Sequence, residues 1–456
     1  MCEERSQRSG RERSDEMVTL NANGSAGRSR WVSLVAAVAL IAWSAAAHAQ
    51  ARTTAASDYP GGYVVLPKII VHTTGGTPPV ALGGIATDTL IQMSNTNEAA
   101  PITVDCWWVD ANSHCGAVCN PTVSDCVICE TNADCAAQGL PGLNCVTDWS
   151  VRDFQVTLTN GQPIGFLASS GLNPVPCDPG PPAPPSTCQA AGGGSVQPVQ
   201  EDPFRGELKC VQVDVNDVPV LRSDLKIEAT IISTGVPSPI INPPPGVATT
   251  AASYNGIGFA ALDDGTGDPA DPLCLGSLPT GSPDACAATY VPCPGVLILD
   301  SFFEGATTEI GGIVNTELTL VPCSENLGDP TVGRDFDVLA QMLIYNEFEQ
   351  RLSTSARVEC FRSTPLLLIG NPNGSPQGVF SVGTQGTLTG QTRIRGVQGS
   401  NGPLGFGLLG VATENYRTTP TGDILATDAF NLHNSGFRAN GDAVYRTQFP
   451  PAPPPP

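Results

Sequence analysis

Two groups of acidic side chains in this sequence could do chemistry, and the first lies in a glycine-rich loop. Its aspartates are Asp263, Asp264, Asp268 and Asp271. Carboxylates and the carbonyls of a flexible backbone are the oxygen ligands that calcium prefers. The glutamate that completes an EF-hand loop does not follow at the required spacing. The loop is therefore a candidate structural calcium site, with a plain acidic turn as the alternative.

The second group of carboxylates lies in the segment Phe336–Leu352. Its apolar residues alternate with polar ones, which favours a strand, although several of its residues are also helix formers. On such a strand Tyr345, Glu347 and Glu349 share one face, and successive carboxylate-bearing Cα atoms lie about 6.6 Å apart. Glycosidases hold their two carboxyl groups roughly 5 to 9.5 Å apart. The pair is thus a candidate for polysaccharide hydrolysis, and a solvent-exposed row on an ordinary strand is the alternative.

Other catalytic patterns are missing from the sequence. Beyond residue 49 the only histidines are His72, His114 and His433, and neither G-x-S-x-G nor H-E-x-x-H occurs. His72 ends an apolar stretch and His433 lies among turn-forming residues, so both are interpreted as structural. Gly405–Gly410 fits the dinucleotide-binding pattern G-x-G-x-x-G, but the residues after it do not predict the required helix. We interpret it as a glycine-rich turn before a strand.

Cysteines concentrate in one short segment. Six of the 16 cysteines fall in a stretch with little apolar periodicity: Cys115, Cys119, Cys126, Cys129, Cys135 and Cys145. Such a stretch cannot bury a core of its own, so we predict that three disulfides hold it. The alternative is a zinc site, because the first four of these cysteines have ligand-like spacing and His114 lies beside them. Export to an oxidising compartment favours disulfides.

The N-terminal sequence predicts such export. Arg28 and Arg30 precede an apolar run from Trp31 to Ala47, and Ala47-His48-Ala49 has the small-residue pattern that signal peptidase cleaves. An uncleaved membrane anchor is the alternative. Met17 is an alternative start that gives the ordinary charge layout of a signal peptide.

The cysteines beyond the signal peptide are therefore expected to be paired. Cys177 and Cys188 flank a proline-rich loop, and their bridge would close it, whereas Cys274 and Cys286 would pin an acidic linker. Only Cys2 of the 16 cysteines precedes residue 50, so an odd number remains and one thiol is left over.

The composition excludes whole classes of structure and function. The 456 residues include 49 glycines and 42 prolines, so long helices are not expected. Charged residues account for only 14% of the chain and hydrophobic residues for 41%, which favours a packed core over disorder. The net charge of −21 is incompatible with the phosphate contacts of nucleic-acid binding.

Short segments rich in β-branched residues predict the strands that must position these groups. They span 63–72, 89–94, 102–109, 154–158, 208–215, 225–232, 296–303 and 316–321. Turn-forming residues separate them at sandwich-like spacing. The predicted fold class is all-β, with two tandem, related antiparallel β-sandwiches of immunoglobulin-like architecture and a disulfide-rich insert in the first.

The predicted organisation has six parts along the chain. They are a signal peptide (1–49), a leader (50–59), a first sandwich (60–262), an acidic linker (263–294), a second sandwich (295–445) and a proline-rich tail (446–456). The first sandwich contains the cysteine-rich insert at 110–148 and a Pro/Gly-rich loop at 171–203. Four short blocks recur in the same order in both halves, so we predict a tandem duplication. They include Leu225–Thr230, which matches Leu408–Thr413, and Val104–Trp107, which matches Val358–Phe361.

Longer blocks carry a resemblance to a family. These are FRGELKC at Phe204–Cys210, NEFEQRLSTSARVECF at Asn346–Phe361, GQTRIRGV at Gly390–Val397 and GLLGVATE at Gly407–Glu414. They resemble those of an uncharacterised family of predicted secreted, cysteine-containing proteins from Gram-negative bacteria. The resemblance implies export and a single architectural unit, and it supplies no active site.

These observations together favour a non-enzymatic function. We expect an exported structural or binding protein, secreted or at the cell surface, with an extracellular protein or glycan as partner and no transmembrane segment after cleavage. The alternative is a secreted polysaccharide hydrolase that uses Glu347 and Glu349. A bound cofactor is not expected, apart from calcium at the Asp263 loop.

Overall fold

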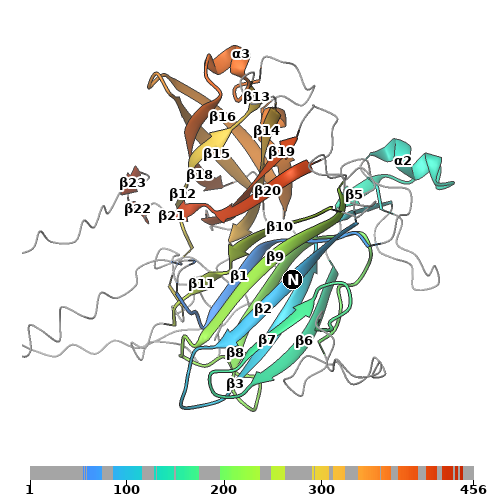
Figure 1. Cartoon of the computed structure of the whole chain (residues 1–456), viewed down its shortest axis with the longest axis vertical. Coiled ribbons are helices and arrows are strands. Elements are labelled where there is room, and N and C mark those ends of the chain that lie inside the picture. The colour runs from blue at the N-terminus through green and yellow to red at the C-terminus, as the bar shows by residue number, and fades with distance from the viewer. Residues whose placement is uncertain are drawn as a thin grey trace, which may run out of the picture. The chain divides into compact units, whose positions relative to one another are not determined.

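A computed structural model of the chain has the architecture drawn in Figure 1. The structure describes residues 55, 57, 59–73, 86–115, 128–129, 131–147, 150–173, 196–236, 248–261, 290–291, 293–307, 312–323, 337–359, 361–370, 378–398, 407–417, 424–434, 437–439 and 442–444. The predicted signal peptide, the proline-rich tail and nearly all of the acidic linker lie outside these residues.

The first sandwich consists of two antiparallel sheets. One sheet has the order β11 (Ile257–Phe259), β1 (Tyr63–Val71), β8 (Phe204–Val213), β3 (Ile102–Asp110) and β6 (Ser150–Leu158). The other has the order β10 (Ala248–Asn255), β9 (Leu225–Val236), β2 (Ala86–Asn95) and β7 (Pro163–Leu167). In Figure 1 these strands run from blue to green.

Alternation of apolar residues builds the core between these sheets. Val104, Cys106 and Trp108 of β3 are fully buried, whereas the residues between them are partly exposed. The Trp108 ring lies 5.5 Å from that of Phe154, and its indole nitrogen donates to the Gln197 carbonyl at 2.8 Å. A period of two therefore places one face of each strand in the core, as the sequence predicts.

The second sandwich has the same kind of architecture. One sheet has the order β16 (Arg351–Glu359), β15 (Asp337–Asn346), β18 (Thr389–Gln398), β12 (Val296–Phe303) and β21 (His433–Asn434). The other has the order β13 (Gly305–Thr307), β14 (Gly312–Cys323), β19 (Gly407–Arg417) and β20 (Ile424–Asn431), and β17 (Arg362–Pro365) also pairs with β14. A small hairpin of β22 (Phe437–Ala439) and β23 (Asp442–Val444) follows. The predicted class, all-β with two tandem antiparallel sandwiches, is confirmed.

Strand order corresponds between the two sandwiches. If β1 is matched with β12, β8 with β18 and β3 with β15, the two five-stranded sheets have the same order. The sequence blocks Leu225–Thr230 and Leu408–Thr413 then fall on the matching strands β9 and β19. The sequence match of Val104–Trp107 with Val358–Phe361 does not fit this scheme, because it relates β3 to β16.

The segment predicted as one strand over Phe336–Leu352 is instead a hairpin, so this prediction was wrong. Strand β15 ends at Asn346, and β16 begins at Arg351 and pairs back along β15. The side-chain oxygen of Asn346 accepts hydrogen bonds from the backbone N–H groups of Phe348 (3.0 Å) and Gln350 (2.8 Å). Asparagine stabilises turns in this way, so the residue that interrupts the apolar alternation is the one that ends the strand.

The two sandwiches share buried residues. Tyr63 and Phe259 belong to the first sandwich, Val321 and Leu409 to the second, and all four lie in one apolar cluster. A disulfide between Cys293 and Cys323 lies in the same cluster. Each sandwich contributes apolar side chains to this cluster. A shared core therefore joins the two sandwiches, in addition to the chain segment that connects them.

Candidate binding site beside the cysteine-rich insert

Four polar side chains converge where the cysteine-rich insert leaves the first sandwich. Asp110 is the last residue of β3, His114 lies in β4 (Ser113–Cys115), and Glu201 precedes β8. The His114 Nε2 atom lies 3.2 Å from Glu201 Oε2, and the Asn112 amide donates to Glu201 Oε1 at 2.6 Å and to the Pro203 carbonyl at 2.9 Å. Asp110, Asn112 and His114 are all buried.

Electrostatics in this cluster favour an ionised Glu201. Burial by itself would raise the pKa of its carboxyl group, but hydrogen bonds with His114, Asp110 and Asn112 outweigh burial and lower that pKa. Asp110 also receives a hydrogen bond from the Asn112 backbone N–H at 2.9 Å. The cluster therefore stabilises negative charge in a site with little access to water.

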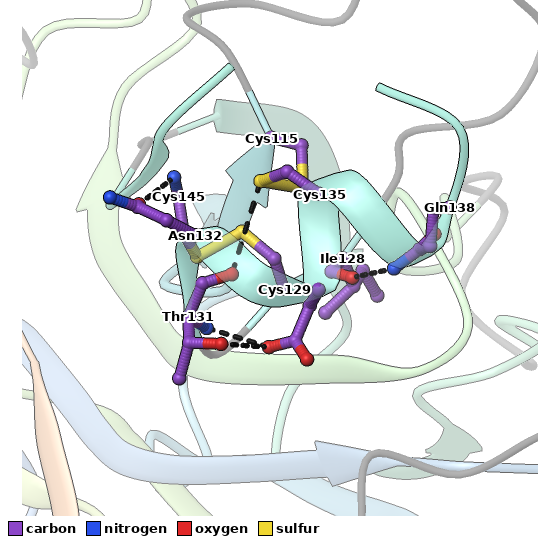
Figure 2. The surroundings of a disulfide bond; sticks show 9 residues. Cys115, Ile128, Cys129, Thr131, Asn132, Cys135, Gln138 and Cys145 are labelled. Carbon is purple, nitrogen blue, oxygen red and sulfur yellow. Dashed lines mark hydrogen bonds between the residues drawn. A yellow bond between two sulfur atoms is a disulfide. The ribbon is translucent and has the colours of Figure 1, made fainter. Parts of the chain in front are cut away.

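Two disulfides hold the insert that carries His114 (Figure 2). Cys115 bonds to Cys135 of helix α2 (Asn132–Ala137), and Cys129 bonds to Cys145 at the start of β5 (Cys145–Thr147). A capping box lies at the start of α2, where Asp134 accepts a hydrogen bond from the backbone N–H of Thr131 at 2.6 Å. Such short elements lack a hydrophobic core of their own. Disulfides and helix capping therefore stabilise their folded conformation.

These disulfides decide between the two interpretations of the cysteines. Cys115, Cys129 and Cys135 have sulfur atoms close together, but all three are disulfide-bonded, so none is a thiolate that could bind zinc. Disulfides in the insert, as predicted, are confirmed for these residues, and Cys119 and Cys126 lie outside the described residues. A fourth bridge, Cys106–Cys210, links β3 to β8 inside the sandwich.

A polar cavity of about 530 Å³ lies next to the cluster. It is lined by Ile70, Val71, His72, Ala111, Asn112, Ser113, Ile128, Cys129, Pro203, Phe204, Arg205, Phe361, Arg362, Ser363 and Thr364. A second cavity of about 450 Å³ shares Ile70, Arg205, Phe361 and Ser363 with it and also contains Lys68, Glu317 and Arg417. The basic side chains Arg205 and Arg362 thus face a hollow to which both sandwiches contribute.

A buried ion pair forms part of the second cavity. The Lys68 ammonium lies 3.1 Å from Glu317 Oε1 and donates to Thr413 Oγ1 at 2.9 Å, and the Lys68 side chain is only 2% exposed. Burial lowers the pKa of Lys68, although Glu317 opposes this effect. For Glu317, burial acts to raise the pKa, but the charge of Lys68, hydrogen bonds from Ser363 and Lys68, and the charge of Arg205 together outweigh it, so the pKa is lowered. Lys68 belongs to the first sandwich and Glu317 to the second, so this pair links them.

Of the sequence-predicted site residues, the structure describes Glu347 and Glu349. Asp263, Asp264, Asp268 and Asp271 lie outside the described residues. Glu347 and Glu349 lie in the β15–β16 turn, where Glu349 has a φ of 59° and the Glu347 carboxylate accepts from the Thr389 hydroxyl at 2.8 Å. Because this turn breaks the alternation, the strand spacing on which the glycosidase hypothesis depended does not apply.

His72 and His114 each lie beside a carboxylate of the segment that precedes β8. His72 pairs with Thr87 through the backbone and lies 4.0 Å from Asp202, and His114 contacts Glu201. The period-two spacing of Asp110, Asn112 and His114 was a local signal for their shared face. Glu201 could not be found this way, because it lies 87 residues further along the chain.

A further carboxyl group was missed because it belongs to no motif. Glu304, between β12 and β13, is 3% exposed and accepts hydrogen bonds from the Thr316 backbone N–H (3.0 Å) and the Asn315 amide (3.2 Å). Burial raises its pKa to about 7, and the nearby charge of Glu414 acts in the same direction. The pKa of Glu414 is itself raised, by burial and by Asp428.

Comparisons with known proteins leave the family open. No family model matches the chain, and no curated protein matches it. Among solved structures, a variant of the major pilin from Streptococcus pyogenes aligns at 11% identity and a TM-score of 0.14, covering 75% of this chain and 98% of the pilin. The CupB6 tip adhesin from Pseudomonas aeruginosa aligns at 11% identity and a TM-score of 0.09, covering 82% and 98%. Likenesses at this level carry no argument about function.

Among the residues that the structure describes, no helix has the length and apolar character needed to cross a bilayer.

Proposed function

We propose that this chain is an exported, non-enzymatic β-sandwich protein with a structural or binding role outside the cell. The observation that supports it best is the joining of two sandwiches by a common apolar cluster and by the Lys68–Glu317 pair. A unit joined in this way holds its surfaces in fixed positions, which suits a scaffold or a binding module. Disulfides such as Cys106–Cys210 persist in oxidising compartments, which supports export.

The cavity beside the insert is the candidate partner site. Arg205 and Arg362 line it together with the polar residues Asn112, Ser363 and Thr364. Guanidinium groups bind carboxylates and other acceptors strongly, so an extracellular protein or glycan with acidic or hydroxyl groups fits this lining. Arg205 lines both cavities, which makes it the side chain to change first.

A hydrolase is the second candidate function. Glu304 is a better candidate for its catalytic acid than Glu347 or Glu349 of the β15–β16 turn. A carboxyl group with a pKa of about 7 beside a second carboxylate, Glu414, is the pattern of a general acid. Against this role, Glu304 is only 3% exposed, and neither cavity described above is lined by it.

One experiment separates binding from catalysis. The chain from residue 50 onwards should be applied to arrays of acidic and neutral glycans and assayed for hydrolysis of polysaccharides, esters and peptides. We expect binding without turnover, and Arg205→Gln should weaken binding while the matched control Arg222→Gln, in an exposed ion pair with Asp224, should not. Turnover that disappears with Glu304→Gln would overturn the non-enzymatic proposal.

Calcium at the Asp263 loop is a separate part of the proposal, based on sequence alone. Four aspartates close in the chain repel one another unless a cation or solvent screens them. We expect millimolar calcium to raise the unfolding temperature, and Asp264→Ala to remove that gain, because a ligand that binds only the folded state stabilises it. An unfolding temperature that calcium leaves unchanged would favour the acidic turn.

We also propose that the two sandwiches arose by tandem duplication. The shared strand order and the placement of Leu225–Thr230 and Leu408–Thr413 on β9 and β19 support this origin.

A further inference from the structure

We propose that Asp110, His114 and Glu201 form a zinc-binding site that fastens the cysteine-rich insert to the first sandwich. Each residue offers one ligand atom, and these atoms all lie within 4.8 Å of one another. The set is mixed, with one imidazole nitrogen and two carboxylate oxygens. Zinc accepts this combination, whereas calcium prefers oxygen ligands alone.

The geometry of the pair matches two ligands of one tetrahedral ion. With zinc–ligand distances of about 2.0 to 2.1 Å, neighbouring ligand atoms in a tetrahedron are separated by about 3.3 Å. The His114 Nε2 and Glu201 Oε2 atoms are separated by 3.2 Å. The same separation is also within the ordinary range of an N–H···O hydrogen bond, so these two atoms can form such a bond before an ion is bound. The two atoms are thus spaced to share an ion without moving apart.

Asn112 fixes the carboxylate for this role. It is 6% exposed, and its amide donates to Glu201 Oε1 at 2.6 Å and to the Pro203 carbonyl at 2.9 Å. These bonds hold the Glu201 carboxylate beside the imidazole, where His114 Nε2 lies 3.3 Å from Oε1 and 3.2 Å from Oε2. Outer hydrogen bonds of this kind orient metal ligands and are typical of metal sites.

Charge balance also favours a divalent cation. Two carboxylates and one imidazole meet at a site where Asp110 is 1% exposed and His114 is 5% exposed. Buried charges are costly unless they are paired or bind a metal. A divalent cation bound by all three side chains would stabilise the carboxyl groups at this buried position.

Such an ion would join three separate segments of the chain. Asp110 ends β3, His114 lies in the insert strand β4, and Glu201 precedes β8. The insert is closed by its own disulfides, Cys115–Cys135 and Cys129–Cys145, which do not attach it to the sandwich. With three protein ligands, water completes the tetrahedron.

Metal titration of the whole exported chain tests this inference. Protein freed of metal by a chelator and dialysis should bind one zinc ion per chain in calorimetry, with every described disulfide intact. Glu201→Gln and His114→Gln should each weaken zinc affinity by about 100-fold or more, because each removes a ligand. The matched control is His72→Gln, which alters the neighbouring histidine–carboxylate pair with Asp202 and should leave zinc affinity unchanged.

A spectroscopic measurement keeps the test valid if a variant folds poorly. Wild-type protein loaded with cobalt(II) should show the visible absorption of a tetrahedral site and lack the ultraviolet charge-transfer band of a thiolate ligand. Three results would overturn the inference: folded wild type that binds no zinc, zinc affinity that survives Glu201→Gln, or a thiolate band. None of these results depends on whether the protein binds a glycan.

Discussion

Glu317→Gln is expected to lower the free energy of unfolding by about 3 to 5 kcal/mol, the usual cost of removing one partner from a buried ion pair. The Lys68 ammonium is 2% exposed and lies 3.1 Å from Glu317, so the substitution leaves a buried charge without its counter-ion. The hydroxyl of Thr413 remains at 2.9 Å, but a neutral acceptor does not replace a carboxylate. Because Glu317 is 31% exposed, the lower end of the range is the expected value.

Urea denaturation at neutral pH measures this loss of unfolding free energy. Two further variants show whether the loss comes from the stranded Lys68 charge. Glu359→Gln is the matched control, because it breaks an ion pair with Arg357 of similar length, 2.8 Å, whose side chains are about half exposed. It should cost less than about 1 kcal/mol. The double variant Lys68→Met with Glu317→Gln should recover much of the loss, since it removes the stranded charge. If Glu317→Gln and Glu359→Gln lowered the free energy of unfolding equally, the stabilising role assigned to the Lys68–Glu317 pair would be contradicted.

Glu304→Gln is expected to stabilise the protein by about 3 kcal/mol above pH 7 and to have little effect near pH 4. Burial raises the pKa of Glu304 from the ordinary glutamate value of 4.5 to about 7 in the folded state. Between these two values the folded state binds more protons than the unfolded state, so stability falls as pH rises. The stabilisation is complete below about pH 4.5 and is lost as pH passes through about 7.

The difference between wild type and variant isolates this one group. Unfolding free energies should be measured in urea from pH 4 to 8.5, and the wild-type curve should fall away from that of Glu304→Gln across the interval from 4.5 to 7. Glu98→Gln, at an exposed position, should run parallel to the wild type. Parallel curves for Glu304→Gln would show that the carboxyl group is not buried as described.

Period-two patterns were sufficient to predict most strands. The predicted strands at 102–109 and 296–303 agree closely with β3 and β12, because each has one face in a core. The strand predicted at 208–215 actually begins at Phe204, where Gly206 lies against the Val109 carbonyl and a Cβ atom would clash. A close backbone approach of this kind depends on a neighbouring strand, so the local sequence did not reveal it.

The candidate site was less predictable, because its residues meet only through tertiary structure. Lysine within the apolar strand Tyr63–Val71 was a visible signal for a buried partner, since buried lysine needs one. Its partner Glu317 belongs to the other sandwich, and no local pattern connects the two positions. The same holds for His114 and Glu201, which belong to one cluster only because the insert folds back beside β8.

The disulfide between Cys106 and Cys210 has a consequence for a protein exposed to proteases. It spans 104 residues and joins neighbouring strands β3 and β8, so the whole insert lies within the covalent loop that it closes. A peptide bond cut anywhere inside that loop leaves the two fragments linked through this bridge. If the cut falls within the insert between β4 and β5, the sheet pairing of β3 with β8 also remains, since neither strand is cut. Cleavage there would thus yield a two-chain molecule in which the first sandwich keeps its core.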